Sequence, residues 1–276
     1  MAIVLLGIVS VMVASFASGA MQSYFDAERR TELVDTTETA LRRLQRDVRL
    51  ALPNSIRTTV VGTTAYLEFL PIVTGGRYRA ELAGATPPGS CGVGANNLLQ
   101  FGVADSSFVT LGPVSDLPVS SPAGVAAPNY LVVYNLGPGF SNADAYASGS
   151  ATGGNKALLG STSSGACEST IDFASHAFTL ASPGARFHII SRPVTYACNL
   201  ATGQLLRYGN YSITAAQPTP PAGNPALVLD GVSACTLAYD ANALSQRLGI
   251  VSIRLTRTLE GESIRLSHDV MVDNAP

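Results

Sequence analysis

The chain has 276 residues, of which 13% are charged, and its 17 Lys and Arg against 19 Asp and Glu give a formal net charge of -2. This balance argues against a nucleic-acid partner, because phosphate binding needs a concentrated basic face. The 26 Gly and 16 Pro predict long loops, and the length suits one helix with a sizeable head.

Residues 1–25 contain no charged residue and predict a hydrophobic half-helix. A helix rises about 1.5 Å per residue, so about 20 apolar residues cross a hydrocarbon core of about 30 Å. We expect this segment to act as a transmembrane anchor. Its expected membrane-packing or filament-packing residues are Ile3, Leu6, Val9 and Val13.

Residues 26–53 predict an amphipathic stalk that continues the same helix as far as Pro53. Apolar side chains recur three or four positions apart and form one stripe. We expect this stripe to pack on a β-sheet through Leu33, Leu41, Leu44 and Val48.

Charges are segregated along the stalk. Acidic residues lie early, at positions 26, 28, 32, 35 and 38, and arginines lie late, at positions 42, 43, 46 and 49. This order suits the dipole of a helix that starts near the membrane surface. The arginine cluster is typical of a solvated or partner-facing side of a helix.

A cleaved signal peptide is the alternative interpretation of the N-terminus, because small residues follow the apolar run at 17–20. Two features disfavour it. No Lys or Arg precedes the apolar run, and the amphipathic stripe continues past the supposed cleavage site without a break.

Beyond Pro53 the pattern changes to the period of two that is typical of strands, predicted at 65–70, 130–136, 188–191, 194–198 and 205–208. The clearest element is a hairpin, whose turn is Glu260-Gly261. Its apolar positions are Val251, Ile253, Leu255, Ile264, Leu266, Val270 and Val272. A stalk laid across an antiparallel sheet gives an α+β fold class, with domains at 1–25, 26–53 and a β-rich head at 54–276.

Three stretches have the composition of loops. Residues 84–97 are rich in Gly, Pro and Ala, residues 137–166 in Gly, Ser, Ala and Asn, and residues 217–225 in Pro. The second is long enough to be a candidate surface for partners, and a tolerated insertion explains it equally well.

The four cysteines, Cys91, Cys167, Cys198 and Cys235, include no Cys-x-x-Cys pair and no His at ligand spacing, which disfavours zinc. An even count behind a membrane anchor suits two disulfides in an oxidising compartment, with three connectivities open. We favour Cys198–Cys235, which lie in well-patterned β segments, with Cys91–Cys167, which lie in Gly/Ser-rich surroundings. Four free buried thiols are the alternative.

Catalytic motifs are absent from the sequence, so we expect no enzyme activity and no cofactor. Neither a nucleophile elbow, a Walker loop nor a zinc-protease helix occurs. Asp172 and His176 could lie four apart on a helix, although 171–180 reads equally well as an exposed turn. His188 and His268 lie in strand-like runs, where a hydrogen-bonded structural role is expected. No loop spaces oxygen ligands as a calcium-binding EF-hand does.

The chain resembles the type IV pilin superfamily, and most closely the large minor pilins of the MSHA pilus biogenesis MshO group, related to the J-type pseudopilins of type II secretion. The likeness covers both ends and leaves the middle third unsupported. The segments that carry it are QSYFDAERR (22–30), ALRRL (40–44), RDVRLALPNS (46–55), PVTYAC (193–198), VSACT (232–236) and VMVDN (270–274).

This resemblance implies a structural subunit that initiates a type IV pilus or sits at its tip, with a pilin-like long helix on an antiparallel sheet. The implied partners are other minor and major pilins, inner-membrane lipid before assembly and the pilus assembly platform. The implied location is the bacterial inner membrane, single-pass with the head in the periplasm, and later the assembled pilus. A type II secretion pseudopilin, a secreted adhesin domain and a secreted hydrolase remain alternatives.

One departure concerns the N-terminus. Relatives begin with a short basic leader, a Gly-Phe junction and a glutamate early in the mature helix, and none occurs here. We expect Met1 to be an internal methionine of a longer native protein, which an in-frame reading of the upstream genomic sequence would test.

Overall fold

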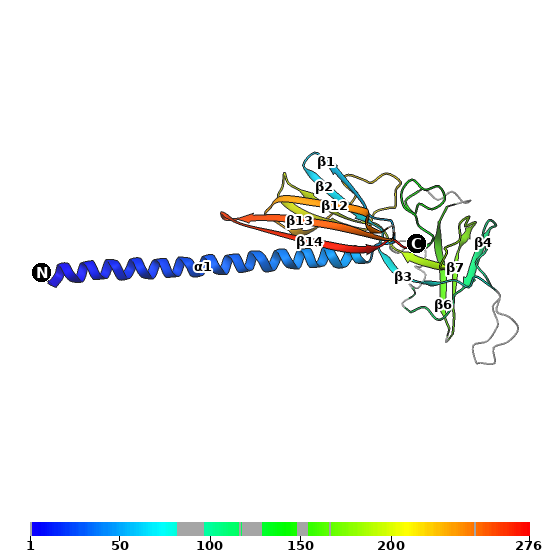
Figure 1. The fold of residues 1–276 in the computed structure, drawn as a ribbon, viewed down its shortest axis with the longest axis horizontal. Coiled ribbons are helices and arrows are strands. Elements are labelled where there is room, and N and C mark those ends of the chain that lie inside the picture. The colour runs from blue at the N-terminus through cyan, green and yellow to red at the C-terminus, as the bar shows by residue number, and fades with distance from the viewer. Residues whose placement is uncertain are drawn as a thin grey trace.

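A computed structural model describes residues 2–81, 97–115, 117, 129–147, 154–165, 167–245 and 247–276. Its first element is the continuous helix α1 (Ala2–Arg49), whose N-terminal half projects far beyond the head (Figure 1). Helix is favoured there because no proline occurs before Pro53. The predicted helix is therefore confirmed and ends at Arg49, before the expected end at Pro53.

Five antiparallel strands form the first sheet, in the order β1-β2-β9-β10-β11. Their bounds are β1 (Arg57–Val61), β2 (Thr64–Phe69), β9 (Val194–Asn199), β10 (Gln204–Tyr208) and β11 (Ala226–Leu229). The direct pairing of β2 with β9 is important, because about half of the chain lies between them in sequence.

The second sheet is a meander of β12 (Val232–Ser245), β13 (Leu248–Leu259) and β14 (Glu262–Asp273). The predicted hairpin is confirmed, since Leu259 pairs with Glu262 around the turn. Both turn residues have positive φ, 49° at Glu260 and 87° at Gly261, as a two-residue hairpin turn of this kind requires. Every predicted apolar position of the hairpin is buried except the half-buried Leu266.

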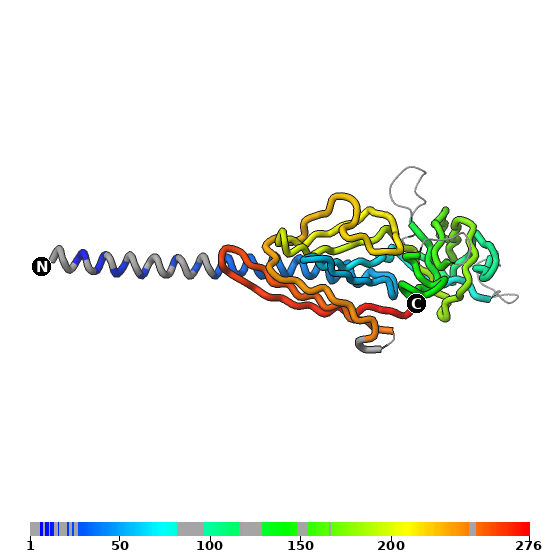
Figure 2. The backbone as a smooth tube through the Cα atoms, turned by 90° about the horizontal axis from the view of Figure 1, so that it is seen from above, coloured from blue at the N-terminus to red at the C-terminus, as the bar shows by residue number. Residues whose placement is uncertain are grey.

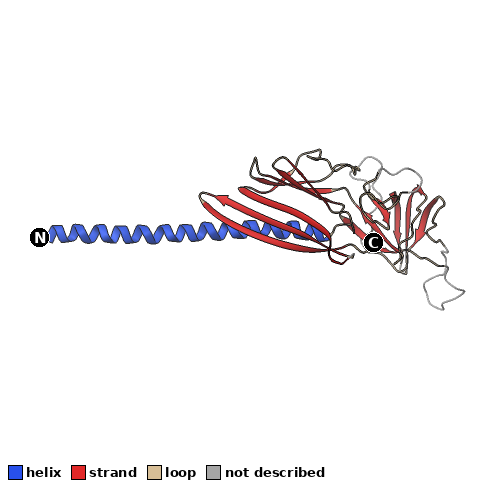
Figure 3. Cartoon of the chain, turned by 45° about the horizontal axis from the view of Figure 1, so that its top comes forward, coloured by secondary structure: helices blue, strands red, loops and turns tan. Residues whose placement is uncertain are grey.

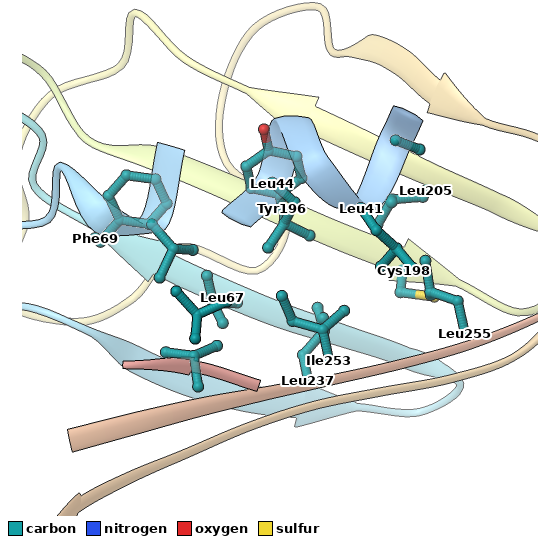
Figure 4. Packing of buried hydrophobic residues seen from close by; sticks show 14 of the residues in the cluster. Leu41, Leu44, Leu67, Phe69, Tyr196, Cys198, Leu205, Leu237, Ile253 and Leu255 are labelled. Carbon is teal, nitrogen blue, oxygen red and sulfur yellow. The ribbon is translucent and has the colours of Figure 1, made fainter. Parts of the chain in front are cut away.

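The main core lies between α1 and these two sheets, as Figure 4 shows from close by. It includes Leu41, Leu44, Leu67, Phe69, Tyr196, Ile253 and Leu255. The predicted Cys198–Cys235 disulfide is present and joins β9 to β12, one strand from each sheet. Cys91 lies outside the described residues, so the second predicted bridge stays a prediction.

Six strands form the third sheet, in the order β3-β8-β5-β6-β7-β4. Their bounds are β3 (Ile72–Arg77), β4 (Asp105–Val109), β5 (Tyr130–Val133), β6 (Lys156–Ser164), β7 (Ser169–His176) and β8 (Arg186–Ile190). The two edge strands meet where Tyr78 bridges Thr110 and the Leu111 N–H donates to the Arg77 carbonyl at 2.8 Å. The sheet therefore closes into a small barrel, which we call the distal barrel.

The distal barrel lies at the end of the molecule farthest from the N-terminus (Figure 2). Its interior is aromatic: Phe108 makes an edge-on contact with Phe187 at 5.2 Å between centroids, and Phe173 and Phe178 pack nearby. Because β2 and β9 pair directly, the whole barrel is an insertion between two neighbouring strands of the first sheet.

A network of asparagines joins the barrel to the end of α1. The Asn54 side chain donates to the carbonyls of Asn135 and Asn274, at 2.9 and 3.0 Å, and Asn135 donates back to the Pro53 carbonyl at 2.7 Å. Asn155 adds a bond to the Asn135 side chain. The turn after the helix, the barrel and the C-terminal strand are thereby held in one arrangement.

The predicted fold class is wrong. An α+β protein with one sheet under a long helix was expected, whereas the described residues contain a single helix and three antiparallel sheets (Figure 3). The molecule is mostly β. The sequence interpretation missed the distal barrel, which adds six strands to the head.

Two local predictions are also wrong. The expected loop at 137–166 contains β6, which pairs with β5 and β7, and the expected turn or helix at 171–180 begins with β7. Residues 217–225 do form a connection without strands, between β10 and β11. Most of the expected loop at 84–97 lies outside the described residues.

Candidate interaction site on the N-terminal helix

The projecting half of α1 presents apolar side chains to the surface. Leu6, Val9, Met12, Val13 and Phe16 expose 55–80% of their area. Of the predicted packing positions, Leu6, Val9 and Val13 are thus free to meet another molecule, and the Ile3 side chain lies outside the described part. Exposed apolar area of this extent is typical of an interaction surface.

A membrane span was expected over the same segment. Among the residues whose side chains are described, no helix is long and apolar enough to cross a membrane.

The second half of α1 is fastened to the head by apolar packing. Leu41, Leu44 and Val48 are fully buried in the main core, where they meet both sheets. Leu33 is also buried, nearer to the point where the helix leaves the head. The helix is therefore buried against the head between Leu33 and Val48, and it projects beyond the head toward its N-terminus (Figure 1).

Two polar contacts add to this attachment. One Asp47 carboxylate oxygen accepts hydrogen bonds from the Tyr196 hydroxyl at 2.8 Å and from Arg207 Nε at 2.9 Å. Burial raises the pKa of Tyr196, so its hydroxyl stays protonated and remains a donor. These contacts connect the last turns of α1 to β9 and β10.

The buried Arg257 on β13 makes a further connection. Its guanidinium donates to the Thr36 hydroxyl at 2.6 Å and to the Asp230 carboxylate at 2.6 Å. Position 257 continues the alternation of Val251, Ile253 and Leu255, which places Arg257 on the apolar face of the strand. A charged residue at such a position is a sequence signal for a buried polar contact. The contacts of Asp47 could not be found in this way, because Tyr196 and Arg207 lie far from Asp47 in the sequence.

Asp172, His176 and His268 each bond to separate partners. Asp172 accepts hydrogen bonds from Ser107 at 2.8 Å and from Ser161, whereas His176 Nε2 lies 2.8 Å from the Gly154 carbonyl. His268 has the expected structural role, between Glu38 at 3.1 Å and Gln45 at 3.4 Å. The described residues contain no group of His, Cys, Asp and Glu that could hold a metal ion.

His188 on β8 differs from the expectation of a hydrogen-bonded role, because its Nε2 has no partner within the described part of the chain. Burial lowers the pKa of His188 to about 4, and the charge of Arg186 acts in the same direction. The folded protein therefore holds this imidazole in its neutral form at neutral pH.

This burial predicts a loss of stability in acid. The unfolded chain takes up a proton near pH 6.5 and the folded chain only near pH 4, so stability falls as pH drops through this window, by about 3 kcal/mol. Replacing His188→Leu is expected to remove that part of the pH dependence. Urea unfolding at pH 7 and pH 4 measures the free energy of unfolding at each pH. If this free energy falls by the same amount in the variant as in the unaltered protein, the assignment to His188 is refuted.

Comparisons of the chain with protein-family models, with curated proteins and with solved structures find no match.

Proposed function

We propose that this protein is a structural subunit of a bacterial type IV filament, a minor pilin of the MSHA type that acts in initiation or at the tip. The observation that carries the proposal is a helix with two different halves. One half exposes apolar side chains beyond the head, and the other is fastened into the head. The resemblance of segments 22–30 and 46–55 supports the same function.

The proposed mechanism is assembly rather than chemistry. Before assembly, residues 1–25 hold the subunit in the inner membrane with its head in the periplasm. The early stalk carries acidic residues, which agrees with translocation of that side, because cytoplasmic flanks prefer Lys and Arg. In the filament, the apolar half-helix packs against neighbouring minor and major pilins after the assembly platform extracts the subunit.

A J-type pseudopilin of type II secretion would use the same helix in the same way and differs in the filament it joins.

A secreted adhesin with a cleaved signal is the competing class. Continuous helix from Ala2 to Arg49 argues against it, because cleavage near residue 20 would cut through one element. A periplasmic species that begins near Met21, found by mass spectrometry, would overturn the pilin proposal.

The test replaces two exposed apolar residues together, Leu6→Asp and Val9→Asp. Each charge at mid-bilayer costs about 2.5–3.5 kcal/mol, so we expect loss of membrane retention and of filament incorporation. The melting temperature of the head should be unchanged, since neither side chain contacts the head. Val60→Asp is the matched control, because Val60 is 69% exposed on β1 and lies in the head. Normal incorporation of the double variant would refute the proposal.

A further inference from the structure

A pocket lies where α1 leaves the head, between the helix and the turn of the C-terminal hairpin. Its volume is about 340 Å³, which is the size of a small-molecule site. Four charged side chains and two leucines line it, and we call it the hairpin pocket: Arg29, Glu32, Leu33, Arg257, Leu259 and Glu260. A lining with both signs of charge and some apolar surface suits a ligand that has the same three features.

The charges that line the hairpin pocket do not cancel. Arg257 is already matched, because its guanidinium donates to the Asp230 carboxylate at 2.6 Å. Arg29 lies 3.5 Å from Glu260, and the two side chains are 55% and 66% exposed. An exposed pair of this kind contributes only about 0–1 kcal/mol, so its members can turn to a ligand at little cost. With Glu32 added, the pocket has one carboxylate more than its cations.

The helix dipole does not account for Glu32. Acidic residues early in the stalk were expected to suit a helix that starts near residue 26. Since α1 begins at Ala2, Glu32 lies in mid-helix, where the dipole has no effect, and that expectation is wrong. Within the described chain Glu32 is exposed and forms no ion pair. Its carboxylate is therefore open to a cation from outside the chain.

The hairpin turn is the part of the head that reaches farthest toward the N-terminus (Figures 1 and 2). It meets α1 at Arg29, four residues after Phe25, where the segment without charged residues ends. Four residues span about 6 Å of helix, and each headgroup layer of a bilayer is about 5–8 Å thick. In a subunit anchored by residues 1–25, the hairpin pocket thus opens at the depth of the lipid headgroups.

We propose that the hairpin pocket binds the headgroup of phosphatidylethanolamine, a zwitterionic phospholipid. The phosphate pairs with Arg29, and the ammonium donates to the carboxylates of Glu32 and Glu260. Leu259, which is 44% exposed at the turn, contacts the apolar part of the lipid. The bound headgroup ties the hairpin turn to α1 until the subunit leaves the bilayer. The inference deepens the proposed function and rests on it for the membrane setting.

Two other common headgroups match the pocket less well. A choline headgroup carries a positive charge but has no N–H to donate to a carboxylate. A glycerol headgroup leaves the lipid with a net negative charge and brings no cation to the unmatched carboxylate. The preference among the three lipids is therefore the signature of the site.

Native mass spectrometry of the full chain in mild detergent measures this preference. The probes are phosphatidylethanolamine, phosphatidylcholine and phosphatidylglycerol with the same acyl chains. We expect the unaltered protein to retain the first about tenfold better than the others, the effect of one charge-assisted hydrogen bond. The double variant Arg29→Gln with Glu32→Gln should retain all three equally. Both positions are exposed, so the variant should keep the melting temperature of the unaltered protein.

The matched control is Glu28→Gln with Arg30→Gln. It removes the same two kinds of charge from exposed positions at the same depth, outside the lining of the hairpin pocket. It should keep the preference for phosphatidylethanolamine. Equal retention of the three lipids by the unaltered protein overturns the proposal. So does a preference that survives in the pocket variant, or one that is lost in the control as well.

Fluorescence locates the lipid in a bilayer. The chain contains no tryptophan, so Leu259→Trp introduces a single emitter at the hairpin turn. The full chain is placed in vesicles of phosphatidylethanolamine and phosphatidylcholine in equal parts, with brominated acyl chains, which quench tryptophan, on one lipid or the other. Quenching should be stronger when phosphatidylethanolamine carries the bromine. Phe140→Trp, in the connection after β5 near the opposite end of α1, should show no quenching.

Failure of the proposed function has a different outcome. If the unaltered chain does not float with the vesicles and Leu259→Trp is quenched by neither lipid, residues 1–25 do not anchor the protein, and the proposed function fails together with the pocket. If the chain floats and Leu259→Trp is quenched equally by both lipids, the anchor stands and only the headgroup site is refuted.

Discussion

Replacing Arg57→Met is expected to destabilise the protein by about 3–5 kcal/mol, because it leaves the carboxylate of Glu68 buried without its cation. Arg57 Nε donates to Glu68 at 2.8 Å, and Glu68 is completely buried. The same guanidinium donates to the carbonyls of Thr214 and Ala215 and lies 3.7 Å from the ring centroid of Tyr146. Its loss therefore also frees the connection between β10 and β11.

The effect should depend on pH. Burial raises the pKa of Glu68 above its ordinary value, although the hydrogen bond and charge of Arg57 oppose the shift. Without Arg57 the pKa of Glu68 in the folded protein rises further. The variant therefore keeps its stability at a pH below about 4.5, the pKa of Glu68 in the unfolded chain, and loses stability as the pH rises above that value. Urea unfolding at pH 5 and pH 8 measures the difference.

A second substitution provides the control. Glu68→Gln keeps the shape and removes the charge, so the double variant with Arg57→Met should recover much of the loss at pH 8. A single variant that loses less than about 1 kcal/mol, or loses it equally at both pH values, would show that the pair contributes little.

The elements predicted correctly from sequence are those that local pattern defines. Helix α1 was predicted because no helix-breaking residue occurs before Pro53. The C-terminal hairpin was predicted from the alternation of apolar and polar residues on both sides of Glu260-Gly261. The Cys198–Cys235 bridge followed from the strand character of its flanks. In each case the information lies within a few residues of the element itself.

The distal barrel could not be predicted in this way. Strand β6 ends in Gly160-Ser161-Thr162-Ser163-Ser164, which has no apolar alternation and becomes a strand because β5 and β7 pair with it. The aromatic residues of the barrel come from separate segments between positions 78 and 187. Such contacts depend on tertiary pairing, which single-sequence periodicity does not report.

The attachment of α1 was predicted only in its apolar part. The stripe with Leu41, Leu44 and Val48 follows helical periodicity, and these residues do lie in the main core. The polar contacts of Asp47 with Tyr196 and Arg207 join positions that lie 149 and 160 residues apart in the sequence. No local pattern encodes a pair of that kind.

Replacing Phe187→Ala is expected to unfold the distal barrel while leaving the helix and the first two sheets folded. Phe187 is fully buried, and truncating a buried phenylalanine costs about 3–5 kcal/mol. The barrel is an insertion between β2 and β9, which pair directly, so the first sheet stays closed when the insertion opens. The Cys198–Cys235 bridge also holds the two sheets together independently of the barrel.

Hydrogen exchange measures this outcome. Amides of β4, β5 and β8 should lose protection in the variant, whereas those of β12, β13 and β14 should keep it, as expected for separate cooperative units. Phe140→Ala is the control, because Phe140 is 55% exposed in the connection after β5. Equal loss of protection in β13 would mean that the asparagine network at Asn54 couples the barrel and the sheets into one unit. Selective loss would mean that the helix-bearing sheets keep their fold without the barrel, which is what the proposed filament packing through α1 requires.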